Sequence, residues 1–133
     1  TILMADHGLK LYGNAIIVNT DFASSNAKVV KSFLGAVGKG WKDAVSNTSS
    51  AIDALVKRNP AADKNLEERR FNLALSGNVM TDYVLKNGMG NIDNARFEAA
   101  IAQLSETYKY KNKPNAKLYF TDAYLPRGGF KLK

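Results

Sequence analysis

The chain has 133 residues, with 19 Lys plus Arg against 12 Asp plus Glu, 45% hydrophobic residues and no cysteine. This length and balance fit one globular domain, or part of a larger one, that can bury a core; they exclude a disordered or collagen-like chain. The lack of cysteine excludes disulfide frameworks, zinc ribbons, iron–sulfur sites and thiol nucleophiles. No strictly aliphatic run is longer than that of residues 15–18, which is far short of the roughly 20 residues needed to cross a bilayer and excludes a transmembrane protein.

One strand is predicted, near the start of the chain. Residues 9–18 form an apolar run interrupted by Gly13 and Asn14, and the β-branched end of this run is typical of a strand buried on both faces. The chain starts at Thr1 inside apolar sequence, with neither an initiator Met nor the basic-then-apolar pattern of an export signal. We therefore expect a processed or truncated chain.

A long helix is predicted after this strand, over about residues 26–46. Its apolar positions recur at spacings of four, three, four and four residues: Val30, Leu34, Val37, Trp41 and Val45. The helix also contains Gly35, Gly38 and Gly40, each of which costs on the order of 1 kcal/mol relative to Ala in a helix interior. We expect a neighbouring backbone to approach closely at these glycines, and we expect Trp41 to lie in the core.

Three further helices follow. The second begins at polar caps in residues 47–50 and ends at Asn59, because a proline at the next position disfavours helical geometry in its predecessor. Residues 61–76 are rich in helix formers and predict the third, and Asp93 caps a fourth with a narrow apolar stripe. A short helical piece near residues 82–86 and a loop over residues 87–91 lie between the last two.

The predicted strand has no predicted neighbour. The tail beyond Pro114 is too apolar to hang free, and we expect a docked, turn-like carboxyl terminus. A lone strand cannot satisfy its own backbone hydrogen bonds, so this one must join a sheet supplied outside the 133 residues or by a second copy of the chain. The expected fold is therefore mainly α with one or two strands, and the chain alone should form a homodimer or be marginally stable.

The sequence predicts no catalytic or metal site. His7 is the only histidine, and neither Asp6 beside it nor any serine stands at a spacing that specifies a catalytic triad. One histidine without cysteine leaves only scattered carboxylates as metal ligands. Gly88 and Gly90 match the first two glycines of a dinucleotide fingerprint, but Asp93 stands where the third is required, so we interpret them as turn residues. We expect that the protein is not an enzyme.

The net charge of +7 is spread along the chain except for one basic cluster, which comprises residues 108–113 and Lys117. Its tyrosines alternate with lysines, as they do on some nucleic-acid-binding surfaces. A solvated lysine-rich turn after a helix is the commoner cause of this pattern. The competing functions are therefore a basic helical nucleic-acid-binding module or an adaptor module that docks through exposed helix faces.

The order of landmarks resembles the carboxyl-terminal part of ABC-importer solute-binding proteins of the NMT1/THI5-like group, which bind sulfonates, taurine, nitrate or thiamine-precursor pyrimidines. Five stretches carry the resemblance: ADHGL at 5–9 leading into YGNA at 12–15, residues 30–41 ending in Gly40-Trp41, ALVKRNP at 54–60, GMGNID at 88–93 leading to Phe97, and FTDAYLP at 120–126. The resemblance implies a carboxyl-terminal fragment of a two-lobed α/β periplasmic binding protein-like fold (type II), with the ligand in a cleft that closes by hinge bending.

This resemblance also implies a division of the chain. Residues 1–18 would form a strand segment at a lobe crossing, and residues 19–133 the helical part of the first lobe with the docked tail, making one incomplete domain overall. We expect Tyr12, Gly13 and Asn14 to face the ligand, because they interrupt an apolar strand with hydrogen-bonding groups and a permissive backbone; the alternative is that they only shape the crossing strand.

The same resemblance implies partners and a location. They are a small-molecule ligand bound by the full-length protein and the ABC permease that receives it, with no cofactor and no nucleic acid. The location would be periplasmic or extracellular, with membrane association through the transporter.

Overall fold

The computed structural model describes residues 2, 4–112 and 114–133. Within these residues it is mostly helical, with six α-helices: α1 (Thr20–Ser25), α2 (Ala27–Ser46), α3 (Thr48–Arg58), α4 (Lys64–Ala74), α5 (Asp82–Asn87) and α6 (Asn94–Tyr108). Short 3-10 turns, η1 (Met4–His7) and η3 (Ala116–Leu118), lie near the two ends of the chain, and one π turn, η2 (Leu75–Val79), follows α4.

Side-chain caps fix the starts of the predicted helices. Asn47 accepts a hydrogen bond from the backbone N–H of Ser50 at 3.0 Å at the start of α3, and Asp93 accepts one from Arg96 at 2.8 Å at the start of α6. Each cap satisfies a backbone donor that has no partner inside the helix. The predicted start of α3, its end before Asn59 and the Asp93 cap are confirmed.

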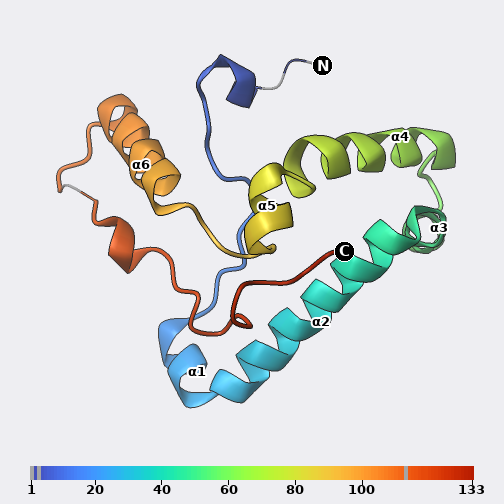
Figure 1. Ribbon diagram of the computed structural model, residues 1–133, viewed down its shortest axis with the longest axis horizontal. Coiled ribbons are helices and arrows are strands. Elements are labelled where there is room, and N and C mark those ends of the chain that lie inside the picture. Colours follow the sequence, from blue (N-terminus) through green and yellow to red (C-terminus); the bar gives the residue numbers. More distant parts are fainter. Residues whose placement is uncertain (1, 3, 113) are drawn as a thin grey trace.

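The long helices are arranged around the carboxyl-terminal segment (Figure 1). α2 and α4 form two arms joined by α3, and α6 lies on the other side of α5. The carboxyl-terminal segment runs between α5 and α2, and the chain ends beside α2 (Figure 1). The last segment therefore contacts both α2, at Gly38, and the loop after α5, at Met89.

The carboxyl-terminal tail docks by backbone pairing, as predicted. Met89 and Phe130 form an antiparallel bridge in which each N–H donates to the other's carbonyl at 2.9 Å. Leu132 is buried, and the ring of Phe130 lies against Gly38 where a side chain would stand. The approach at Gly38 is by an aromatic side chain and not by a backbone. The expectation for Gly35 and Gly40 is wrong, because nothing lies within 4 Å of the position a Cβ would take there.

The predicted strand does not form within the described residues. Residues 9–18 lie as an extended run of chain between η1 and α1 (Figure 1), and no described residue hydrogen-bonds to the backbone of residues 13–18. Ile17 is 93% exposed, so its expected burial on both faces is also wrong for this chain. The reason is the absence of a neighbouring strand, since the one backbone pairing between extended residues in the described part of the chain is Met89 with Phe130.

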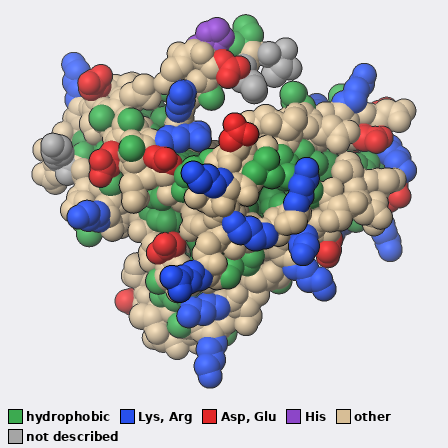
Figure 2. Space-filling model, viewed as in Figure 1, with side chains coloured by type: hydrophobic (Ala, Val, Ile, Leu, Met, Phe, Trp, Pro, Cys, Tyr) green, Lys and Arg blue, Asp and Glu red, His purple; other side chains and the backbone are tan. Residues whose placement is uncertain are grey.

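A sizeable core is likewise missing. Among the described residues only five apolar side chains are buried: Ala23, Val30, Ile52, Ala100 and Leu132. The accessible surface is 10329 Å², whereas a folded monomer of 14.5 kDa exposes about 6,900 Å². Hydrophobic side chains are visible on the surface between α2 and α4, and Lys and Arg side chains are scattered over the same view (Figure 2). The core formed by the described residues is thus small.

Candidate functional site

The predicted site residue Tyr12 is held by the start of α6. Its hydroxyl accepts a hydrogen bond from the Asp93 N–H at 2.7 Å and lies 3.5 Å from the Asp93 carbonyl, to which it donates. Its ring meets Phe97 edge to face, with centroids 6.1 Å apart. The Arg96 guanidinium lies 4.5 Å above the same ring, a cation–π arrangement. Tyr12 is half-buried. We call Tyr12 and its contacts with Asp93, Arg96 and Phe97 the Tyr12 anchor.

Arg96 extends this anchor to the neighbouring backbone. Its Nε donates to the Lys10 carbonyl at 2.9 Å and its Nη2 donates to the Leu11 carbonyl at 2.8 Å. Two donors of one planar guanidinium therefore bind consecutive carbonyls, which fixes the direction of the chain just before Tyr12. The contacts join parts of the sequence that are more than 80 positions apart.

The other two predicted site residues are open to solvent. Gly13 has nothing within 4 Å of the position its Cβ would take, and Asn14 is exposed. The amide side chain of Asn14 makes no hydrogen bond to any described residue. The three residues are consecutive but have different surroundings, and their role in binding stays a prediction.

A groove of about 740 Å³ lies beside Phe97. It lies between α5, the start of α6 and the carboxyl-terminal segment, with Phe97, Phe120 and Ile92 as apolar lining. Lys86, Lys117 and Lys131 lie among its polar residues, together with Glu98 and Asp122. The sequence contains no indication of this groove, because nothing local in it brings the carboxyl-terminal segment to α5.

Tyr83 connects this groove to the Tyr12 anchor. Burial raises the pKa of the Tyr83 phenol above its ordinary value of 10.0, and the proximity of the Tyr12 phenol and the Asp93 carboxyl group raises this pKa further. The phenol therefore remains neutral, and able to donate a hydrogen bond, to higher pH than a free tyrosine.

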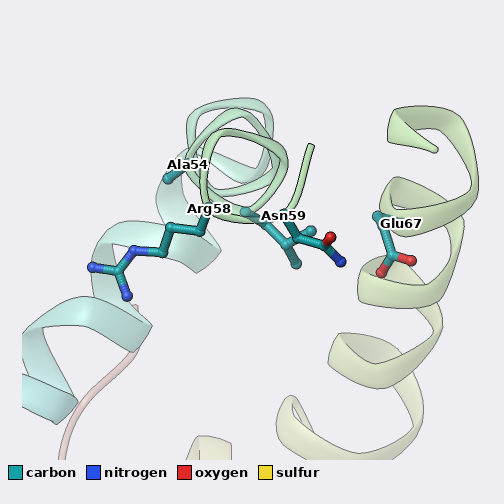
Figure 3. Close-up of a pocket in the computed structure, with 5 residues that line it drawn as sticks. Ala54, Arg58, Asn59 and Glu67 are labelled. Atoms are coloured by element: carbon teal, nitrogen blue, oxygen red, sulfur yellow. The ribbon is translucent and has the colours of Figure 1, made fainter. Parts of the chain in front are cut away.

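A second pocket, of about 530 Å³, lies between α3 and α4 (Figure 3). Arg58 points away from Glu67 in this view, and Glu67 instead accepts a hydrogen bond from Arg70 Nη1 at 2.7 Å. Glu67 and Arg70 thus form an ion pair at i,i+3 within α4. The charged side chains do not converge on a common point in this pocket, so it offers little for a polar ligand.

The remaining residues considered from the sequence are dispersed. His7 is exposed in η1. Within residues 2, 4–112 and 114–133, no three His, Asp or Glu side chains lie close enough to hold a metal ion. Trp41 is half-buried and stacks on Phe71, with centroids 6.4 Å apart and the rings inclined by 11°. Trp41 thus contributes to helix packing.

Part of the basic cluster is also visible in the structure. Tyr108 and Tyr110 stack with centroids 5.9 Å apart, and both are exposed. Lys109 between them adopts a left-handed conformation at the end of α6, with φ 49°. Lys113 lies outside the described residues. This end of α6 presents a small aromatic and cationic surface.

The comparison with protein families concerns the part of the chain that contains Tyr12, Gly13 and Asn14. Residues 1–51 match the family model described as NMT1/THI5 like. This match covers the first two stretches of the resemblance, around residues 5–15 and 30–41, and does not extend to the three later ones. No curated protein and no solved structure matches the chain. No α-helix in the described residues is both long and apolar enough to span a membrane.

Proposed function

We propose that the chain is part of the substrate-binding component of an ABC importer, which captures a small polar nutrient and delivers it to the membrane permease. The observation that carries this proposal is the NMT1/THI5-like match over residues 1–51. That family suggests a solute-binding role in transport or thiamine synthesis, and we favour transport. The nutrient would be a sulfonate, taurine, nitrate or a pyrimidine-like compound, and the protein would act in the periplasm or outside the cell.

The fold proposed for the complete protein has two lobes, of the type II periplasmic binding protein class. Residues 1–18 would cross between the lobes and residues 19–133 would complete the first lobe. Support comes from the unpaired backbone of residues 13–18 and from the excess of exposed surface, because both are explained by a sheet outside these residues.

The proposed mechanism is binding without covalent chemistry. A ligand that contacts both lobes binds the closed form better than the open form, and this differential affinity shifts the population towards closure. Tyr12, Gly13 and Asn14 are the proposed contacts in this chain. The free amide of Asn14 can donate and accept hydrogen bonds, whereas the hydroxyl of Tyr12 already bonds to Asp93.

Equilibrium binding tests the proposal. Taurine, an alkanesulfonate, nitrate and hydroxymethylpyrimidine would each be titrated into the product of the complete reading frame and into the 133-residue chain. We expect the complete protein to bind one of them, and the shorter chain to bind none tightly because it holds only part of the cleft. Failure of the complete protein to bind any of the four would contradict the proposal, as would tight binding by a monomer of the 133-residue chain.

A second candidate function, nucleic-acid binding, rests on the stacked and exposed pair Tyr108 and Tyr110 beside Lys109. Exposed aromatic rings next to cations can stack bases while the cations contact phosphates. This function requires binding of single-stranded DNA or RNA that weakens steeply as salt rises. An electrophoretic shift assay at low salt that shows no complex would reject it.

A further inference from the structure

The helix α2 has two apolar faces, and only one of them is covered. The covered face contains Val30, Leu34 and Trp41, which are buried or half-buried. The second face, which we call the outer stripe, consists of Val29, Phe33, Ala36 and Gly40, spaced by four, three and four residues. All four members of the outer stripe are exposed.

The two faces are adjacent on the helix surface, since successive residues are rotated by about 100°. Together they form an apolar arc much wider than the single face of a helix that borders solvent. The lysines of α2, among them Lys28, Lys39 and Lys42, lie outside this arc and are exposed. A helix with so wide an apolar arc is typical of an element packed between two layers.

The segment before α2 also exposes apolar side chains. Phe22 in α1 is exposed, and so are Ile16, Ile17 and Val18. Together with Val29 and Phe33, these side chains leave on the order of 600 Å² of apolar surface open, taking roughly 150–200 Å² for each complete side chain. A stable interface takes about 800 Å² from each partner. The open surface is therefore close to that of one side of a stable interface.

We propose that the apolar face of a β-sheet covers the outer stripe of α2, and that the same sheet pairs with residues 13–18. We choose a β-sheet as the partner because the backbone of residues 13–18 is unpaired. Only another extended backbone can hydrogen-bond to a whole row of amide and carbonyl groups. A strand and the helix that follows it closely also pack against the same sheet in most folds.

Gly38 and Gly40 of α2 fit this arrangement. Gly40 lies on the outer stripe and leaves open space where a side chain would stand, whereas Gly35 lies on the lysine side of α2. A close approach is thus present at Gly38, against Phe130, and the proposed covering layer would supply one at Gly40. The inference rests on the proposed function in one respect, since the sheet is taken to be that of the solute-binding protein.

Cysteine labelling tests this surface, because the chain has no cysteine of its own. Phe33→Cys and Val29→Cys report the outer stripe, and Lys39→Cys is the matched control on the lysine side of α2. Each variant would be made in the 133-residue chain and in the product of the complete reading frame, and the rate of reaction with a thiol reagent would be measured. We expect both stripe cysteines to react at least tenfold more slowly in the complete protein than in the 133-residue chain, with no change at Lys39→Cys.

Equal rates at Phe33→Cys and Lys39→Cys in the complete protein would overturn the inference, and Val29→Cys gives the same test if Phe33→Cys does not fold. Slow labelling of the 133-residue chain that depends on its concentration, with a dimer in sedimentation, would also overturn it by assigning the stripe to a second copy. The labelling needs no nutrient. If the complete protein protects the outer stripe but binds none of the four nutrients, the proposed function is contradicted while the inference about the outer stripe is supported.

Discussion

Tyr12 shows how one side chain can fix the path of a segment that has no regular structure. Its hydroxyl both accepts from and donates to the backbone of Asp93, and its ring lies between Arg96 and Phe97. A half-buried hydroxyl with good partners contributes about 1 kcal/mol net. Its removal therefore has a measurable effect on stability, even though the segment around it is open.

Tyr12→Phe keeps the ring and removes the hydroxyl. We expect this substitution to lower the free energy of unfolding by about 1 kcal/mol, because the Asp93 N–H loses its partner. Urea unfolding followed by circular dichroism measures the change. Tyr119→Phe is the matched control, since Tyr119 is 65% exposed, and its midpoint should not move. Equal midpoints for the two variants would show that the Tyr12 hydroxyl does not hold the segment.

The raised pKa of Tyr83 predicts that the stability of the chain depends on pH at alkaline pH. Burial raises the pKa of Tyr83 above 10.0, so the phenol is protonated in both states at neutral pH and contributes fully there. As pH rises above about 10, the unfolded chain loses the proton first, and stability falls until the folded-state pKa is passed. Unfolding midpoints measured between neutral and strongly alkaline pH should decline less steeply for Tyr83→Phe. A decline as steep as that of the unsubstituted chain would contradict the raised pKa.

At the scale of elements, the contact between α2 and the carboxyl-terminal segment depends on one glycine. A Cβ at Gly38 would collide with the ring of Phe130, whereas a Cβ at Gly35 would meet nothing. Both glycines lie inside the same helix. Substitution of each glycine by alanine therefore separates the effect of helix propensity on stability from the effect of packing against Phe130.

Gly38→Ala and Gly35→Ala should change stability in opposite directions. Alanine favours a helix over glycine by roughly 0.5–1 kcal/mol, so Gly35→Ala should stabilise the chain by about that amount. Gly38→Ala should destabilise it by roughly 1–3 kcal/mol, because Phe130 must be displaced. Thermal unfolding of the two variants provides the comparison. Stabilisation by both substitutions would show that the tail is not docked on α2.

The helices could be predicted because their signals are local. The cap of α6 at Asp93 and the stop of α3 before Pro60 depend on residues within one turn of the chain. Residues 9–18 failed as a strand because pairing depends on a partner that local sequence cannot supply. The outer stripe also follows helical spacing, but spacing alone does not tell whether a helix face is covered, and only the structure shows that Val29 and Phe33 are exposed.

Parts of the candidate site that join distant segments could not be predicted. Tyr12 was selected for its hydrogen-bonding group, but its partner Asp93 lies 81 positions away. The groove beside Phe97 depends on the docked tail, whose path between α5 and α2 has no signature in the sequence beyond its apolar composition. The family resemblance supplied the expected function, and the family-model match over residues 1–51 supports a solute-binding role in general.

At the scale of the whole molecule, the large accessible surface and the small core both indicate that apolar surface is left uncovered. A chain of this mass should expose about 6,900 Å² and instead exposes 10329 Å², while few of its described apolar side chains are buried. The surplus includes the outer stripe of α2 and residues 16–18. These are the surfaces that a covering sheet would remove from water, and their burial would stabilise the assembled protein.

Amide hydrogen exchange at residues 13–18 tests the central claim most directly. In the 133-residue chain these amides have no described partner and should exchange at nearly the rate of an unfolded peptide. In the product of the complete reading frame, pairing with a sheet should slow them by at least about 100-fold, an opening free energy of about 2.7 kcal/mol. Exchange that is equally fast in both proteins would contradict the proposed sheet and, with it, the assignment of this chain to a larger two-lobed binding protein.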